Sequence, residues 1–92
     1  MKYFAVFLPM LDPEKSATYR QEHLDYLAKL NAEGKVFAYG RFTDGAGGLI
    51  IYRTETEEEA RALAQNDPYV VHKARGCEFH EWDMKSNAIA QP

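Results

Sequence analysis

The chain has 92 residues, of which 46% are hydrophobic and 27% are charged, a balance typical of one small globular domain rather than of a disordered or fibrous protein. Its formal net charge is -3 and it has no basic run, which argues against a nucleic-acid partner, because phosphates require clustered lysines and arginines. The single cysteine excludes an internal disulfide and a cysteine-based zinc cage, and it is typical of a reducing compartment.

The start of the chain could be mistaken for a signal peptide, because an apolar stretch follows Met1 and Lys2. That stretch is too short, and no cleavage site of small residues follows it. Instead, Asp12 and Pro13 indicate the start of a helix. We therefore expect a first strand over residues 3–8, no targeting or membrane segment, and a cytoplasmic protein.

The first helix is predicted over residues 13–32. Asp12 can cap it with its carboxylate, and Gly34 is a natural C-terminal stop. Five residues of this helix recur at helical spacing and share one face: Arg20, His23, Leu24, Leu27 and Leu30.

A β-hairpin is predicted next, with strands over residues 36–42 and 49–53 joined by a glycine-rich turn. The second helix should begin at a capping box, in which Thr56 caps the helix and Glu59 stands three residues later. Pro68 marks the end of this helix.

The last strand is predicted over residues 77–84. We expect a single domain over residues 1–84, followed by a polar tail over residues 85–92. The element order is therefore β-α-β-β-α-β, the ferredoxin-like pattern of the α+β class. It predicts one antiparallel sheet with two helices on one face.

Apolar side chains occupy both parities of the strands, although one face of such a sheet should meet water. In the third strand, Leu49 and Ile51 alternate with Ile50 and Tyr52. The resulting patch would be larger than a soluble monomer tolerates. We therefore predict a homodimer that packs sheet against sheet, as a dimeric α+β barrel-like assembly. A monomer whose aromatic side chains simply cover its surface is the alternative.

His23 is the first candidate for chemistry. Arg20 lies three residues earlier on the same face, and two such groups on an apolar stripe are costly unless they have partners. Asp67 continues the buried face of the second helix, and antiparallel helices would bring it beside His23. An Asp–His pair can fix the imidazole tautomer, as a general base requires. A structural histidine and an aspartate that merely ends a helix are the alternatives.

Further residues follow in a fixed order along most of the chain: Arg20-x-x-His23-Leu24-x-Tyr26-Leu27-x-x-Leu30, Gly34, Gly40 with Asp44, Gly48, and Asp67-Pro68-Tyr69. Their order and spacing resemble the YciI-like (YCII-related) family. The resemblance implies a dimeric ferredoxin-like fold and an active-site pair at His23 and Asp67. It also implies dehydrochlorination in chloroaromatic breakdown as the activity most clearly associated with the family.

Other possible sites carry weaker signals. Cys77 and His80 have the spacing of a metal-ligand pair, but residues three apart on a strand point to opposite faces. The glycine-rich turn over residues 43–48 lacks the Lys-Ser/Thr of a phosphate loop and precedes no helix. We expect neither a metal nor a cofactor.

Two hypotheses follow. In the first, the protein is a small cofactor-free enzyme that performs an elimination or isomerisation on a small molecule. His23 is its general acid or base and Asp67 orients it. Arg20 binds a carboxylate or oxyanion, and Tyr69 and Tyr3 flank the pocket. In the second, the protein is a non-catalytic dimeric module that binds a small ligand or regulates. A His–Asp pair that faces a cavity favours the first hypothesis, and a pair sealed in the core favours the second.

Overall fold

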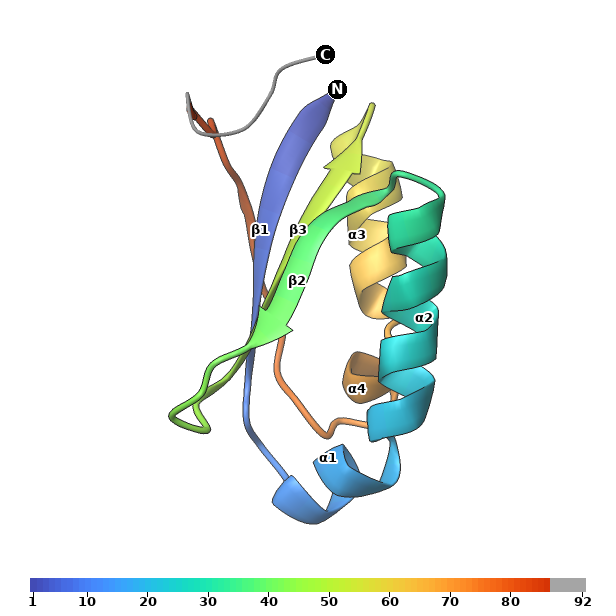
Figure 1. Cartoon of the computed structure of the whole chain (residues 1–92), viewed down its shortest axis with the longest axis vertical. Coiled ribbons are helices and arrows are strands. Elements are labelled where there is room, and N and C mark those ends of the chain that lie inside the picture. The colour runs from blue at the N-terminus through green and yellow to red at the C-terminus, as the bar shows by residue number, and fades with distance from the viewer. Residues whose placement is uncertain (87–92) are drawn as a thin grey trace.

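The computed structural model describes residues 1–86 and places four antiparallel strands in one sheet with all helices on one face (Figure 1). The sheet order is β2-β3-β1-β4, so the two strands of each β-α-β half are separated by a strand of the other half. The expected α+β architecture is confirmed. The strands are β1 (Lys2–Pro9), β2 (Val36–Arg41), β3 (Gly47–Thr54) and β4 (Glu78–Glu81).

Four helices cover the sheet: α1 (Pro13–Thr18), α2 (Arg20–Ala32), α3 (Glu57–Gln65) and α4 (Pro68–Val71). Local capping fixes where three of them begin. The carboxylate of Asp12 accepts hydrogen bonds from the first backbone amides of α1, and Thr56 accepts one from the amide of Glu59 in α3. Asp67 caps α4 in the same way.

The helix predicted over residues 13–32 is interrupted, which corrects the prediction. Tyr19 has φ -99° and ψ 8°, and it both ends α1 and precedes α2. Its ring stacks on His72 with centroids 3.7 Å apart, a tertiary contact between residues far apart in the sequence. The break turns α1 across the end of α2 (Figure 1), so α1 closes one end of the space between the helices and the sheet.

The core fills the inner face of the sheet, where alternate residues of β1 and β3 meet the helices. α2 contributes Leu27 and Leu30, and α3 contributes the small residues Ala60 and Ala64. The buried apolar strand residues of this inner face are Phe4, Val6, Leu8, Val36, Ile50 and Tyr52.

No helix covers the outer face of the sheet in the described chain (Figure 1). Its side chains are largely apolar, and two ring pairs lie on it: Tyr3 with Phe37, and Phe7 with Phe42. Tyr52 belongs to the inner face instead and is fully buried.

The last strand is shorter than the predicted span of residues 77–84. Residues 87–92 of the predicted tail lie outside the described part of the chain. Within residues 1–86, no helix is both long enough and apolar enough to cross a membrane.

Candidate active site

The structure brings His23 and Asp67 together although they are 44 positions apart in the sequence. Nδ1 of His23, from the first half of α2, lies 2.8 Å from Oδ1 of Asp67, at the junction of α3 and α4. Asp67 is fully buried, and His23 is 8% exposed. The contact is therefore a buried hydrogen bond between two titratable side chains.

Local structure holds Asp67 in place before any tertiary contact forms. Its backbone is extended, and Pro68 occupies the first helical position, where its fixed φ suits a helix start. Oδ1 of Asp67 also accepts a hydrogen bond of 2.9 Å from the backbone amide of Tyr69. One oxygen therefore caps α4 and orients His23.

The hydrogen bond assigns the tautomer of the neutral imidazole. A carboxylate only accepts, so Nδ1 of His23 donates its proton to Asp67 and Nε2 is the unprotonated nitrogen. No residue within 1–86 forms a hydrogen bond with Nε2. Because the His23 side chain lines a cavity, the free nitrogen is the one available to a ligand.

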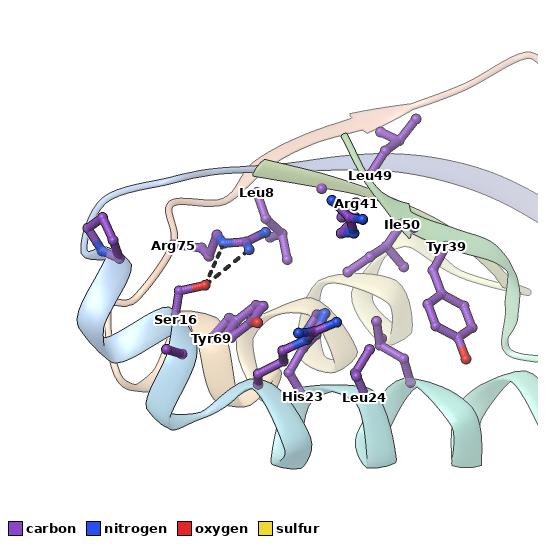
Figure 2. A pocket seen from close by; sticks show the side chains of 16 residues that line it. Leu8, Ser16, His23, Leu24, Tyr39, Arg41, Leu49, Ile50, Tyr69 and Arg75 are labelled. Atoms are coloured by element: carbon purple, nitrogen blue, oxygen red, sulfur yellow. Dashed lines mark hydrogen bonds between the residues drawn. The ribbon is translucent and has the colours of Figure 1, made fainter. Parts of the chain in front are cut away.

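That cavity has a volume of about 520 Å³ and lies between α1 and α2 on one side and β2 and β3 on the other (Figure 2). Much of its wall is apolar and includes Leu24, Leu27 and Ile50. Polar groups line the rest of it, and two of them, Ser16 and Arg75, meet beside α1. The volume and mixed lining suit a small organic molecule.

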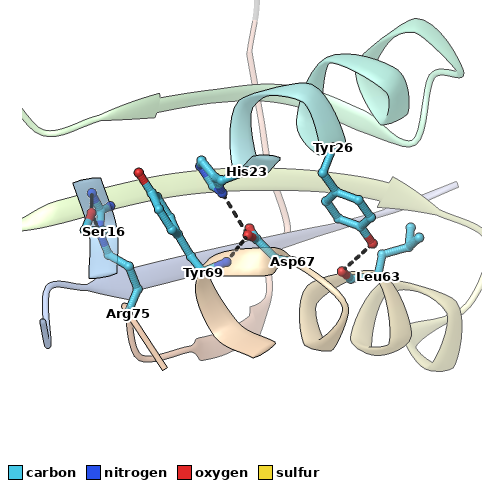
Figure 3. A network of polar contacts seen from close by, with 7 residues as sticks. All are labelled: Ser16, His23, Tyr26, Leu63, Asp67, Tyr69 and Arg75. Atoms are coloured by element: carbon cyan, nitrogen blue, oxygen red, sulfur yellow. Dashed lines mark hydrogen bonds and ion pairs between the residues drawn. The ribbon is translucent and has the colours of Figure 1, made fainter. Parts of the chain in front are cut away.

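Tyr69 links the His–Asp pair to this polar end. Its ring stacks on His23, with centroids 3.9 Å apart and an interplanar angle of 17°. The guanidinium carbon of Arg75 lies 4.5 Å from the same ring. Figure 3 shows Tyr69 between the two side chains, so His23 and Arg75 flank one aromatic ring.

A buried hydroxyl group lies in the electrostatic field of the pair. Burial, followed by the negative charge of Asp67, raises the pKa of the Tyr52 phenol, which therefore stays protonated. Among the described residues, neither the Tyr52 hydroxyl nor Oδ2 of Asp67 has a hydrogen-bond partner. Burial and Asp67 also raise the pKa of the Cys77 thiol and that of the Tyr26 phenol.

Arg20 and Tyr69, both predicted to bind substrate, line the cavity. Arg20 is exposed at its edge, and Tyr69 is buried in its wall. The structure does not bring Tyr3 to this cavity. Tyr3 alternates with the buried Phe4 along β1 and therefore points to the outer face, where it contacts Phe37.

Sequence reasoning missed three cavity residues: Ser16, Arg41 and Arg75. Ser16 and Arg75 are 59 positions apart, and Arg75 follows α4 in a segment without periodic pattern. Strict alternation from the buried Val36 would place Arg41 on the outer face of the sheet. A register shift between Val36 and Ala38 turns Arg41 toward the cavity instead, and the sequence gives no sign of that shift.

Cys77 and His80, which have the sequence spacing of a metal-ligand pair, do not form a shared site. Cys77 packs against the core, whereas His80 is exposed. Within residues 1–86, no group of three or more His, Cys, Asp or Glu side chains is placed to hold a metal ion.

Comparison with known proteins gives three similarities. Residues 1–81 match the family description of the YCII-related domain. The chain is 28% identical over 75 residues to the uncharacterized protein YjpA of Bacillus subtilis (strain 168), a match that covers 77% of this chain and 88% of that protein.

The fold is similar to a solved structure of 5-chloro-2-hydroxyhydroquinone dehydrochlorinase (TftG) from Burkholderia phenoliruptrix AC1100, in complex with 2,5-dihydroxybenzoquinone. The TM-score is 0.76 at 19% identity, and the match covers 90% of this chain and 95% of that one. At this level of identity the similarity establishes the fold alone.

Proposed function

The chain belongs to the family of YCII-related domains, and on that premise we propose that it is a small cofactor-free enzyme that moves a proton on a small molecule. One observation carries the proposal. His23 donates Nδ1–H to the buried Asp67 at 2.8 Å, while the same ring lines a ligand-sized cavity. This is the arrangement that an imidazole general base requires.

In the proposed elimination, Nε2 of His23 takes a proton from a carbon of the substrate. The electron pair of the broken C–H bond becomes a new double bond, and a leaving group such as chloride departs with its own bonding pair. The imidazolium is stabilised by the Asp67 carboxylate and then releases its proton to water. If the proton returns to a different carbon, the same pair performs an isomerisation.

The roles of the surrounding residues follow from their positions. Asp67 holds the tautomer and orientation of His23. Tyr69 supports the ring by stacking, and Arg20 at the cavity edge can bind a carboxylate or oxyanion through its planar fork. The structurally similar dehydrochlorinase was solved with a dihydroxyquinone, and we propose a small ring of that kind as the substrate type here.

The test is hydrogen exchange on 2,5-dihydroxybenzoquinone in deuterated water, followed by proton NMR. Exchange at a ring carbon adds a deuteron from the solvent and removes a proton. It therefore needs an acid–base group and no leaving group. We expect the protein to accelerate exchange, and His23→Gln and Asp67→Asn to reduce the acceleration by about 100-fold or more. His80→Gln, the same change at an exposed histidine of β4, should leave it unchanged.

Acceleration that survives His23→Gln contradicts the proposed role of His23. Binding of the quinone without any acceleration overturns the enzyme proposal. It would instead support the alternative function, a module that binds a small ligand without catalysis.

We further propose that the protein acts as a homodimer that pairs the outer faces of two sheets. The support is the apolar character of that face, on which Phe7 and Phe42 contact each other and Ile51 packs without a covering helix. The single Cys77 is a free thiol, which supports the proposal of a reducing, cytoplasmic location.

Light scattering tests the dimer. We expect a particle of twice the 10.5 kDa chain mass, and we expect Trp82→Glu to shift it toward the monomer, because a carboxylate would be buried without a partner. Trp82 is 44% exposed and follows β4 beside Tyr3. Val71→Glu, at a residue of α4 that is 55% exposed, is the matched control. A wild-type particle of 10.5 kDa at every concentration contradicts the dimer.

A further inference from the structure

The cavity beside His23 has a strongly one-sided charge. Its lining contains three arginines, Arg20, Arg41 and Arg75, and no aspartate or glutamate. Asp67 lies behind His23 and does not line the cavity. On a chain with a formal net charge of -3, such a concentration of positive charge in one cavity is local and does not follow from the overall composition.

None of these arginines is neutralised by a carboxylate of residues 1–86. Among residues 1–86, the ion pairs involve other groups, and no carboxylate lies within ion-pair distance of Arg20, Arg41 or Arg75. A half-buried guanidinium without an anion loses hydration without compensation. Arg75 is in that situation, and its charge is therefore available to a ligand.

Arg75 is also fixed in position. Its Nε and Nη2 atoms donate to Oγ of Ser16 at 3.3 Å and 3.0 Å, and its guanidinium lies over the ring of Tyr69. Nη1 donates to no atom of the described residues and lies beside β3, since a Cβ built on Gly48 would be 3.4 Å from it. An immobilised guanidinium loses little entropy when it binds an anion.

The Ser16 hydroxyl adds a donor at the same point. Oγ accepts from Arg75, and its own hydrogen is used in no hydrogen bond within residues 1–86. Ser16 and Arg75 thus present an O–H and an N–H group from α1 and from the segment after α4. Both residues line the cavity, and an O–H together with a charged N–H suits the oxygens of a carboxylate, a phenolate or an enolate.

From this geometry we propose that the cavity binds a small organic anion, with the anionic group on Arg75 and Ser16 and an apolar ring-sized body against Leu24, Leu27 and Ile50. Arg75 and His23 lie on opposite sides of the ring of Tyr69, and all three line the cavity, so a ligand that extends along the edge of this ring contacts both (Figure 3). Arg20 also lines the cavity and carries the same charge. Arg41 adds a third guanidinium from the side of the sheet (Figure 2). The inference rests on the proposed function in taking this cavity as the substrate site.

The test compares benzoate with benzamide, which have nearly the same shape but differ in charge. Each is titrated into the 15N-labelled full chain at constant ionic strength, and amide shifts give the affinity. We expect benzoate to bind about tenfold more tightly than benzamide, and Arg75→Gln to remove about that factor. Arg75→Lys, which keeps the charge without the fork, should lie between the two.

Arg61→Gln is the matched control, because it removes the same charge from an exposed site on α3 that does not line the cavity. Its benzoate affinity should stay within about twofold of that of the wild type. That change is much smaller than the one expected from the loss of a hydrogen bond to a charged group. Arg20→Gln should weaken benzoate binding as well, which keeps the test usable if Arg75→Gln does not fold.

Three outcomes overturn the inference: equal affinity for benzoate and benzamide, an equal loss in the Arg75 and Arg61 variants, or no saturable shift with benzoate. None of them touches the exchange chemistry of His23. Conversely, His23→Gln should keep benzoate binding and abolish exchange on the quinone. The exchange measurement therefore tests the proposed function, and the benzoate measurement tests the inference independently.

Discussion

The space between the sheet and the helices is filled differently at its two ends. At one end, α3 presents Ala60 and Ala64 to the sheet, and these small residues let the helix lie close to β1 and β3. At the other end, the short helices α1 and α4 do not fill the layer, and the cavity of about 520 Å³ remains beside them. The same inner face of the sheet is therefore dry core at one end and ligand-sized space at the other.

The difference shows where a small α+β domain can place a site. A helix two or three turns long with a small-residue stripe fills the layer, whereas short helices bring polar caps to it. Of the groups at this end, Asp67 is the cap of α4 and Arg75 follows the same helix, whereas Ser16 and His23 lie within α1 and α2. The site thus combines side chains of regular helices with groups from the junctions around α4.

The largest expected difference between the two ends is in the stability lost when a large apolar side chain is replaced by alanine. Phe4 is fully buried and stacks on Phe79, so Phe4→Ala should lower the free energy of unfolding by about 3–5 kcal/mol in urea. Leu24 lines the cavity and is only half-buried, so Leu24→Ala should cost about 1 kcal/mol. Similar losses for the two variants would show that the cavity end is packed as tightly as the α3 end.

Removal of the buried cap should come next in size. Asp67→Ala leaves the Tyr69 amide and Nδ1–H of His23 without an acceptor, and should cost about 2–3 kcal/mol. Asp67→Asn keeps an accepting oxygen and should cost about 1 kcal/mol. Asp12→Ala removes the exposed cap of α1 and should also cost about 1 kcal/mol. If Asp67→Ala costs no more than Asp12→Ala, the buried hydrogen bonds stabilise the fold no more than an exposed cap does.

These comparisons involve features that the sequence predicted to different degrees. Helix starts at Asp12 and Thr56 were readable because capping depends on residues two or three positions apart. The start of α4 at Asp67 was not predicted, because Pro68 was interpreted as the end of the preceding helix. The His23–Asp67 contact was also predicted, because helical periodicity placed both residues on buried faces and the element order made the helices antiparallel.

The remaining features depend on contacts that leave no local signal. The break at Tyr19 has no glycine or proline to mark it, and it coincides with a ring stack on His72. Arg75 reaches Ser16 only after the chain has folded around α4. The position of Tyr3 is different, because strand alternation with Phe4 already assigned it to the outer face.

A smaller effect is expected at the buried hydroxyl of Tyr52. Since this group has no hydrogen-bond partner within residues 1–86, Tyr52→Phe removes a desolvated polar atom and no hydrogen bond. The free energy of unfolding should stay within about 1 kcal/mol of the wild-type value or rise. A loss well beyond that range in chemical denaturation would mean that the hydroxyl supports the Asp67 carboxylate.

The smallest effect concerns Cys77, whose thiol pKa is raised first by burial and then by Asp67, while Arg61 lowers it. The folded chain therefore holds the thiol proton to a higher pH than the unfolded chain does. The free energy of unfolding should fall as the pH rises through the unfolded thiol pKa, and Cys77→Ser should remove that part of the slope.

Alkylation of Cys77 by iodoacetamide at fixed pH checks the two charges with opposite signs. Asp67→Asn lowers the thiol pKa and should speed the reaction, whereas Arg61→Gln raises it and should slow the reaction. Equal rates in the two variants would mean that the charges of Asp67 and Arg61 do not affect the pKa of the Cys77 thiol.

A single oxygen of Asp67 accepts hydrogen bonds from both His23 and Tyr69, so a change at His23 also affects the backbone of Tyr69. Oδ1 of Asp67 accepts from Nδ1 of His23 at 2.8 Å and from the Tyr69 amide at 2.9 Å, so the two donors share the same lone-pair density. When His23 gains a proton at Nε2, its Nδ1–H becomes a stronger donor and draws on that density, which weakens the bond to the amide. The backbone amide resonance of Tyr69 should therefore shift when Nε2 of His23 is protonated, which allows the protonation to be followed from the backbone.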